Sequence, residues 1–295
     1  MINKQMVSVF VTLVMVILFA ACATQTEQPE DNASDLLTTE QPEDNTSDLL
    51  ATDQPEDNAS DLLALEEWDL LWISDSSGWG VAEIYAAYIE EDTGIPVNVY
   101  DYWAVSLSAG TIVDILEGGS HPNAELARIP ELIPEVEVIV FYANPEESID
   151  EDNPTDSNCA HSSATTYVNA CEMDTFGLYI QHLELIYQHI FELRGDQPII
   201  VRAFDAYNPI PARWEEDGTF DACHACWENY NAAIHQAASE YYIPVARVND
   251  AWNGPDHNED PNDKGYTADG IHPNELGAQV IAEELRKLGY DPVTP

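Results

Sequence analysis

The chain has 295 residues, of which 45% are hydrophobic, enough for one sizeable core. Nine basic residues stand against 55 acidic ones, giving a formal net charge of -46, which argues against nucleic-acid binding because that requires a basic surface. An anionic membrane surface would repel such a chain, so we expect any membrane association to use an inserted or lipid-modified segment.

The N-terminus has the pattern of an export signal. Lys4 supplies a positive charge, and residues 6–21 are almost wholly apolar, a run too short for a typical membrane span. Residues 18–22 read Leu-Phe-Ala-Ala-Cys and resemble a bacterial lipobox, in which the Cys is acylated and becomes the new N-terminus. We therefore predict a signal peptide over 1–22 and a lipid anchor on Cys22, which place the protein outside the cytoplasm. Cleavage after Ala23 and an uncleaved anchor are the alternatives.

Residues 23–64 are predicted to be a disordered acidic linker. Three copies of one 13-residue unit occupy 26–38, 39–51 and 52–64, each with four acidic residues, no basic residue and one proline. A unit with a single Leu-Leu pair cannot build the core of a repeat fold, so we interpret the repeats as a spacer, with a specific binding motif as the alternative. The acidity continues beyond the repeats, because residues 65–295 hold 43 acidic and 8 basic residues. A folded domain of this charge suggests a saline habitat, where salt screens the self-repulsion.

Residues 65–295 alternate short apolar runs with apolar residues at helical spacing. The apolar runs predict buried strands at 69–74, 97–105, 136–142, 198–204 and 244–248. Helices are predicted at 81–94, 110–116, 176–195, 227–242 and 274–288, with Leu193 and Leu276 among the residues on their buried faces. Strands that alternate with helices predict a parallel sheet covered on both faces, and such sheets bind ligands beyond the carboxyl ends of their strands.

Polar residues and glycine follow the first three predicted strands. Ser76 stands in the turn after the first strand, where a helix N-terminus offers N–H groups to developing negative charge. Gly110 follows the second strand and permits close backbone approach, and Asn144 follows the third and can direct an amide N–H into a site. Taken alone, a Ser in such a turn is more often a helix cap, and Gly110 and Asn144 are typical of turns.

The segment that opens the last predicted helix carries the most specific pattern. Asp269 stands three residues before His272. A carboxylate at that distance can bind the imidazole Nδ1 of the histidine and fix its tautomer. This pairing is typical of a histidine that acts as a general base.

Ser76, Gly110, Asn144 and the pair Asp269 and His272 occur in the order of the four sequence blocks of the SGNH (GDSL-type) hydrolase family, which this chain resembles over about residues 68–290. The resemblance implies a flavodoxin-like three-layer α/β/α sandwich with a five-stranded parallel sheet over 65–295. It also implies a catalytic triad of Ser76, His272 and Asp269. The implied oxyanion hole consists of the N–H groups of Ser76 and Gly110 and the side-chain amide of Asn144.

The implied activity is that of a serine esterase that works through an acyl-enzyme and needs no metal or other cofactor. Its substrate would be an acylated glycan, a short acyl ester or a lysophospholipid, and we expect a monomer. Ser74 and Tyr142 stand where the family has glycine, so a cell-surface binding module that kept the fold and lost turnover is one alternative. Another is an α/β-hydrolase with Ser108 as nucleophile, since residues 106–110 approximate the Gly-x-Ser-x-Gly elbow.

Four cysteines follow Cys22 in the sequence. An even number in an exported chain predicts two disulfides, most simply Cys159–Cys171 and Cys223–Cys226. Cross-pairing of the four cysteines, or one zinc site that uses all four thiolates, are the alternatives.

The histidines other than His272 have no comparable partner in the sequence, so we predict that they are surface or packing residues. Trp79 and Tyr142 follow predicted strand ends, where they either line a pocket or pack in the core. No metal site is predicted.

Overall fold

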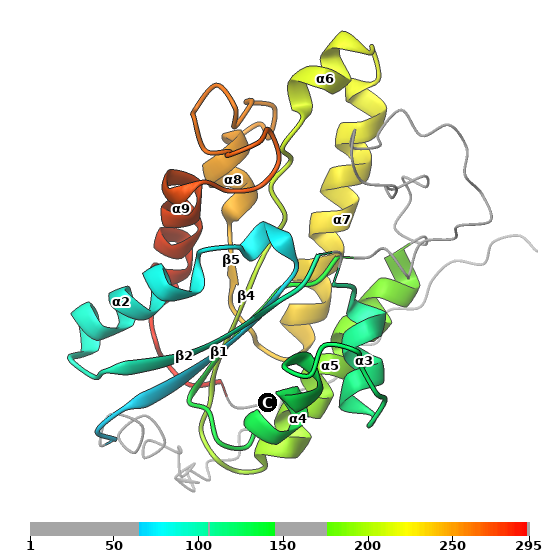
Figure 1. The fold of residues 1–295 in the computed structure, drawn as a ribbon. Helices are drawn as coiled ribbons and strands as arrows, with labels where there is room; N and C mark the ends of the chain where they lie inside the picture. Colours follow the sequence, from blue (N-terminus) through cyan, green and yellow to red (C-terminus); the bar gives the residue numbers. More distant parts are fainter. Residues whose placement is uncertain (1–64, 106, 145–175, 294–295) are drawn as a thin grey trace, which may run out of the picture. The chain divides into compact units, whose positions relative to one another are not determined.

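A five-stranded parallel sheet forms the centre of the part of the chain that the structure describes (Figure 1). The structure is a computed structural model that describes residues 65–105, 107–144 and 176–293, all within the unit Asp53–Pro295. The strand order is β2-β1-β3-β4-β5, with β1 at Trp68–Ser74, β2 at Val97–Trp103, β3 at Val138–Phe141, β4 at Ile200–Phe204 and β5 at Val245–Ala246. Each predicted apolar run coincides with one of these strands, with β1 beginning one residue earlier than predicted, as expected for a parallel sheet that is buried on both faces.

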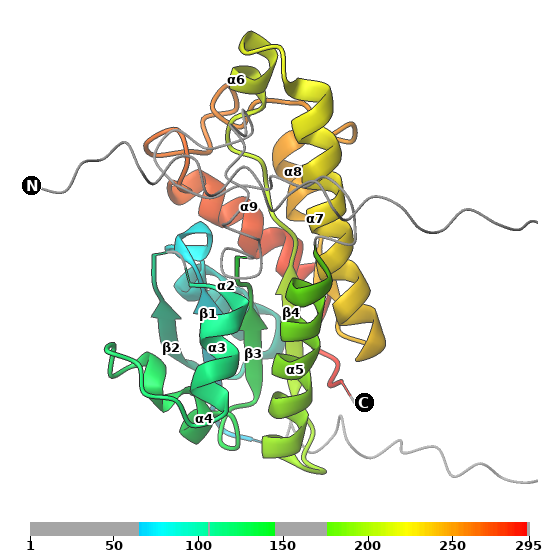
Figure 2. The ribbon, with the colours of Figure 1, turned by 90° about the vertical axis from the view of Figure 1, so that its right-hand side faces the viewer.

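Helices cover both faces of this sheet (Figures 1 and 2). One face carries α2 (Ala82–Thr93), α8 (Val248–Asn253) and α9 (Glu275–Arg286), of which α9 packs against the other two. The opposite face carries α3 (Ala109–Leu116), α5 (Gly177–Arg194) and α7 (Phe220–Glu240), which pack side by side. The shorter elements are η1 (Ser76–Gly78), η2 (Leu126–Arg128), α4 (Ile129–Leu132) and α6 (Pro211–Glu216). The predicted three-layer α/β/α sandwich is confirmed.

Local sequence signals set the ends of several helices. Gly94 ends α2 in the left-handed conformation, with φ of 75°, which glycine adopts without a steric penalty. The Ser108 hydroxyl accepts a hydrogen bond from the Thr111 N–H and caps α3. The Asn274 side chain caps α9 in the same way, by accepting from the Gly277 N–H. The two caps fix the first residues of α3 and α9, and both helices begin at the carboxyl edge of the sheet.

The structure corrects two of the predicted buried helix positions. Leu193 is 38% exposed, because the next residue, Arg194, takes the buried position and donates hydrogen bonds to the carbonyls of Pro134 and Pro198. Leu276 is 48% exposed in the first turn of α9, and Ile281 and Leu285 form the buried part of that helix face instead.

Two element boundaries also differ from the prediction. Helix α7 begins at Phe220, two turns before the predicted start at Trp227. Strand β5 is only Val245–Ala246, because the chain turns into α8 at Val248. The early turns of α7 consist mainly of alanine and cysteine with two polar residues, and α8 is only six residues long, so neither carries a clear helical repeat of large apolar residues.

Several predictions fall on residues outside the described ranges. The signal peptide with Cys22, the repeats, Cys159 and Cys171 all lie there. Cys223 and Cys226 are buried in α7 and both are disulfide-bonded, but their pairing stays a prediction. Across 65–105, 107–144 and 176–293, no helix combines the length and apolar character that a membrane span requires.

Candidate active site

The turn after β1 places Ser76 at the carboxyl edge of the sheet. Asp75 caps the short helix η1, with its Oδ1 accepting a hydrogen bond of 2.7 Å from the Ser77 N–H. A Cβ on Gly78 would lie 2.4 Å from the Ser74 Oγ, so glycine lets the backbone of η1 approach the buried Ser74 side chain this closely. Asp75 is only 8% exposed, and burial raises the pKa of its carboxyl more than the hydrogen bonds from Ser77 and Asn144 lower it.

Asp269 and His272 lie on the long loop between α8 and α9. The Asp269 Oδ1 accepts hydrogen bonds from the backbone N–H groups of His272, at 2.8 Å, and Ile271, at 3.1 Å. Its Oδ2 lies 2.8 Å from the Nδ1 of the His272 ring. The carboxylate therefore holds both the backbone and the ring of His272 and favours the tautomer with the proton on Nδ1.

The structure brings Ser76 and His272 together although they are far apart in the sequence. The Ser76 Oγ lies 3.1 Å from the Nε2 of His272. Burial is the largest single influence on the pKa of Asp269 and raises it, but the hydrogen bonds from the His272 ring and from the His272 and Ile271 N–H groups together lower it more, so the net shift is downward. Asp269 is thus ionised at neutral pH, and a chain of hydrogen bonds runs from its carboxylate through the imidazole to the serine hydroxyl. This arrangement can move a proton from the hydroxyl to the imidazole.

The segments after β2 and β3 meet beyond the end of β1. Ser108 and Asn144 form a parallel bridge, in which the Ala109 N–H donates to the Asn144 carbonyl and the Asn144 N–H to the Leu107 carbonyl, both at 3.1 Å. Gly110 follows in the first turn of α3 and is buried. The Asn144 side-chain amide donates to the Asp75 Oδ2 at 3.4 Å. Asn144 is therefore held beside the turn that carries Ser76, and Gly110 lies in the first turn of α3.

Ser74 and Tyr142, which stand where the SGNH pattern has glycine, are both buried in the core. The Ser74 hydroxyl is fully buried, accepts a 2.8 Å hydrogen bond from the Trp72 indole and donates to the Asp75 carbonyl. Tyr142 is buried, stacks on Phe204 with ring centroids 4.7 Å apart, and shares a 2.8 Å hydrogen bond with the Tyr230 hydroxyl. Of the two aromatic residues named as candidates for a pocket, Tyr142 packs in the core.

Ser108, the alternative nucleophile, serves as the cap of α3. Its hydroxyl bonds to the Thr111 N–H at 3.1 Å and lies 3.0 Å from the Thr111 hydroxyl. Ser108 is 1% exposed. These contacts account for Ser108 structurally, and the geometry favours Ser76 as the reactive hydroxyl.

Tyr207 contributes to the site and was missed in the sequence. It follows β4, is buried, and donates a 2.9 Å hydrogen bond from its hydroxyl to the Ile271 carbonyl, next to His272. Its ring stacks on Trp252 of α8, with centroids 3.8 Å apart. The position after the fourth strand is the signal that could have found it, because that strand also ends at the carboxyl edge.

The prediction that the other histidines lack partners is wrong. His189 and His224 lie 3.8 and 3.6 Å from the carboxylates of Glu192 and Glu228, and two further histidines have carboxylates at hydrogen-bond distance. His235 lies 3.0 Å from the Asp205 carboxylate. His257 lies between two carboxylates, 2.7 Å from Glu228 and 2.6 Å from Asp250. The pairs of His235 and His257 join α7 to residues after β4 and to the α8–α9 region, and the sequence separations hid them.

Comparisons with known proteins support the fold. No protein-family model matches the sequence, and no curated protein matches it. Among solved structures, the lipase Lip_vut3 from a goat rumen metagenome matches 76% of this chain and 98% of its own, at 19% identity and a TM-score of 0.54. LAE5, described as an alpha/beta hydrolase enzyme from the metagenome of Lake Arreo, matches 76% of this chain and 96% of its own, at 13% identity and a TM-score of 0.51. At these identities the likeness shows a shared fold.

Proposed function

We propose that this chain is a serine ester hydrolase of the SGNH type, with Ser76 as nucleophile, His272 as general base and Asp269 as its orienting acid. The observation that carries this proposal is the hydrogen-bonded sequence Asp269–His272–Ser76, with distances of 2.8 and 3.1 Å. The order of the sequence blocks and the shared fold with a lipase support it further.

The proposed mechanism begins when the Ser76 Oγ attacks the ester carbonyl and its proton passes to the His272 Nε2. Asp269 stabilises the imidazolium that results. The oxyanion accepts hydrogen bonds from the N–H groups of Ser76 and Gly110 and from the Asn144 amide. His272 then protonates the leaving alcohol, and the acyl-enzyme remains. Water, deprotonated by the same imidazole, releases the acid and restores Ser76.

The substrate class stays open between an acylated glycan, a short acyl ester and a lysophospholipid. Trp79, directly after η1, is 50% exposed, and its ring lies 6.0 Å from that of Trp103 at the end of β2. An exposed aromatic ring so close to Ser76 in the chain can pack against a sugar ring or an acyl chain. The acidic surface disfavours anionic substrates through its general field.

We also propose that the hydrolase acts outside the cytoplasm, held at a membrane by a lipid on Cys22 and a spacer of residues 23–64. The lipobox-like residues 18–22 and the acidic repeats support this part of the proposal. Mass spectrometry of the N-terminal peptide from membranes of the producing cells tests it, because acylation adds a defined mass to Cys22.

The test of the activity uses the full chain with disulfides intact, p-nitrophenyl acetate, butyrate and octanoate, and both low and high salt. Ser76→Ala is expected to lower kcat by a factor on the order of 10⁶, to the background rate. Ser108→Ala is the matched control, since it removes a helix cap and is expected to cost about 1 kcal/mol of stability with activity retained. Loss of activity in Ser108→Ala alone would contradict the proposal. A folded wild type without activity or covalent labelling would favour the binding module.

A further inference from the structure

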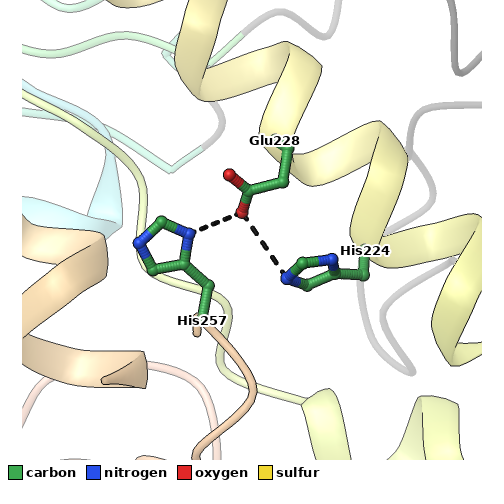
Figure 3. Close-up of side chains that lie close together, drawn as sticks. All are labelled: His224, Glu228 and His257. Atoms are coloured by element: carbon green, nitrogen blue, oxygen red, sulfur yellow. Dashed lines mark hydrogen bonds and ion pairs between the residues drawn. The ribbon is translucent and has the colours of Figure 1, made fainter. Parts of the chain in front are cut away.

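A group of three metal-binding side chains lies outside the proposed active site. His224 and Glu228 come from α7, and His257 comes from the loop after α8 (Figure 3). Because His224 and Glu228 are four residues apart on a helix, they lie on the same face of α7. Figure 3 shows the two imidazoles pointing toward the Glu228 carboxylate. One possible ligand atom from each side chain lies within 4.8 Å of the others.

The spacing of the three ligand atoms suits a metal ion after a small adjustment. The Glu228 Oε1 lies 2.7 Å from the His257 Nδ1 and 3.6 Å from the His224 Nε2. Two ligands in a tetrahedral zinc site with bonds of 2.0–2.1 Å stand about 3.3 Å apart. The 2.7 Å distance between Glu228 and His257 must therefore lengthen, and the distances above 3.3 Å must shorten. Both shifts are within the reach of side-chain rotation.

His224 supplies an independent sign of a binding site. Its Nε2 atom is buried from solvent and has no hydrogen-bond partner among the described residues. A buried nitrogen without a hydrogen bond costs free energy, which a bound cation would recover. The ring is held in place by stacking on Phe220, with centroids 5.0 Å apart and an interplanar angle of 22°. The His224 nitrogen is therefore oriented toward Glu228 before any ion binds.

Asp250 supports the group from the other side. Its Oδ1 lies 2.6 Å from the His257 Nε2, on the side of the ring away from Glu228. In metal sites, a carboxylate at the second ring nitrogen holds that proton and leaves the first nitrogen as a ligand. The side chains of His224, Glu228 and His257 are 27%, 39% and 21% exposed, so an ion can enter from solvent and still be held largely within the protein.

We propose that His224, Glu228 and His257 bind one zinc ion, with Asp250 orienting His257. Two imidazoles and one carboxylate form a donor set that suits zinc, whereas calcium and magnesium prefer oxygen ligands alone. The ion would link α7 to the loop that also carries Asp269 and His272. The site stands independently of the proposed esterase activity, because none of its ligands belongs to the triad.

The test is zinc binding by the untagged, metal-free full chain under non-reducing conditions, so that neither a histidine tag nor free thiols compete. Isothermal titration and elemental analysis are expected to give one zinc ion per chain, and zinc is expected to raise the Tm where calcium and magnesium do not. His224→Gln and His257→Gln are expected to weaken binding by at least about 100-fold, and Asp250→Asn by about 10–100-fold.

His189→Gln is the matched control. His189 faces a glutamate one turn away on α5, 3.8 Å from Glu192, so the variant removes a partly exposed histidine beside a carboxylate. It is expected to bind zinc as the wild type does. Glu228→Gln covers the case in which a histidine variant fails to fold, because the amide keeps a hydrogen-bond acceptor and circular dichroism in chelator reports the fold. No saturable binding to the wild type, or equal binding by the wild type and the well-folded Glu228→Gln and His257→Gln variants, would overturn the proposal.

Discussion

The loop between α8 and α9 carries two histidines whose surroundings differ in one decisive respect. His272 has a carboxylate on one ring nitrogen, Asp269 at 2.8 Å, and the Ser76 hydroxyl on the other, at 3.1 Å. His257 has a carboxylate on each ring nitrogen, Glu228 at 2.7 Å and Asp250 at 2.6 Å. The same residue type on one loop is thus prepared for two different kinds of chemistry.

The difference shows how partners select the role of an imidazole. A histidine with one acidic partner keeps a nitrogen lone pair for the hydroxyl proton, and it can give that proton up again in the next step. In His257, burial favours the neutral ring, but the hydrogen bonds with Asp250 and Glu228 outweigh it and the pKa is raised. Such a ring holds either a proton or a cation tightly and is poorly suited to turnover. The surroundings of His272 therefore fit catalysis, and those of His257 fit binding.

The largest expected effect of a change in this loop comes from Asp269→Asn. An amide at this position would favour the wrong tautomer of His272, and we expect kcat to fall by about 10⁴-fold. Asp263→Asn, an exposed change on the same loop, is the control and is expected to leave kcat at the wild-type level. Steady-state kinetics on a p-nitrophenyl ester makes the measurement. Equal activity of the two variants would show that Asp269 does not act on His272.

A smaller effect is expected from Tyr207→Phe. This variant tests whether Tyr207, just after β4, holds the loop that carries His272. The variant removes the 2.9 Å hydrogen bond to the Ile271 carbonyl and keeps the ring stacked on Trp252. A neutral hydrogen bond contributes about 0.5–1.5 kcal/mol, so we expect kcat to fall by up to about tenfold. KM should stay unchanged, because Tyr207 positions His272 and does not hold substrate.

Tyr242→Phe is the control for this change, since Tyr242 is 75% exposed. A rise in KM with kcat unchanged in Tyr207→Phe would assign Tyr207 to substrate binding instead. If Tyr207→Phe loses activity only at temperatures where its lower Tm leaves it unfolded, Tyr207 has a structural role alone.

The smallest effect concerns the stability that Asp269 adds through His272. The pKa of Asp269 is lowered from 3.8 in the folded state, so its contribution is present above pH 3.8 and is lost as the pH falls through the folded-state pKa. The carboxylate is 54% exposed, and an exposed pair of this kind shifts the Tm by only about 1–4 °C. Thermal melts at pH 7, 5 and 3 are expected to show the Tm of Asp269→Asn slightly below the wild type at pH 7, with the gap closing at low pH. A gap that widens at pH 3 would contradict this sign.

The sheet and most of the proposed site could be predicted because their signals are local. Buried parallel strands such as β1 and β3 appear as continuous apolar runs, and Asp269 and His272 are only three residues apart. Ser76 was placed by its position after β1. Gly110 and Asn144 were placed by the family's block order, and the structure brings Asn144, more clearly than Gly110, to the turn of Ser76.

The surroundings of His257 could not be predicted from the sequence, because its contacts are not local. Glu228 and His257 are 29 residues apart, and their meeting depends on how α7 packs beside the loop after α8. The spacing of His224 and Glu228 on one helix face was a readable signal, but it indicates a ligand pair only once a third partner is known. Tyr207 was missed for a similar reason, because its hydrogen bond reaches a residue 64 positions away.

If Ser76 is the nucleophile, covalent labelling will mark this serine and no other. The full chain would be treated with a fluorophosphonate, digested, and sequenced by tandem mass spectrometry, with Ser76→Ala and Ser108→Ala beside it. We expect one adduct, on Ser76, in the wild type and in Ser108→Ala, and none in Ser76→Ala. An adduct on Ser108 or on Ser77, or an adduct that persists in Ser76→Ala, would contradict it.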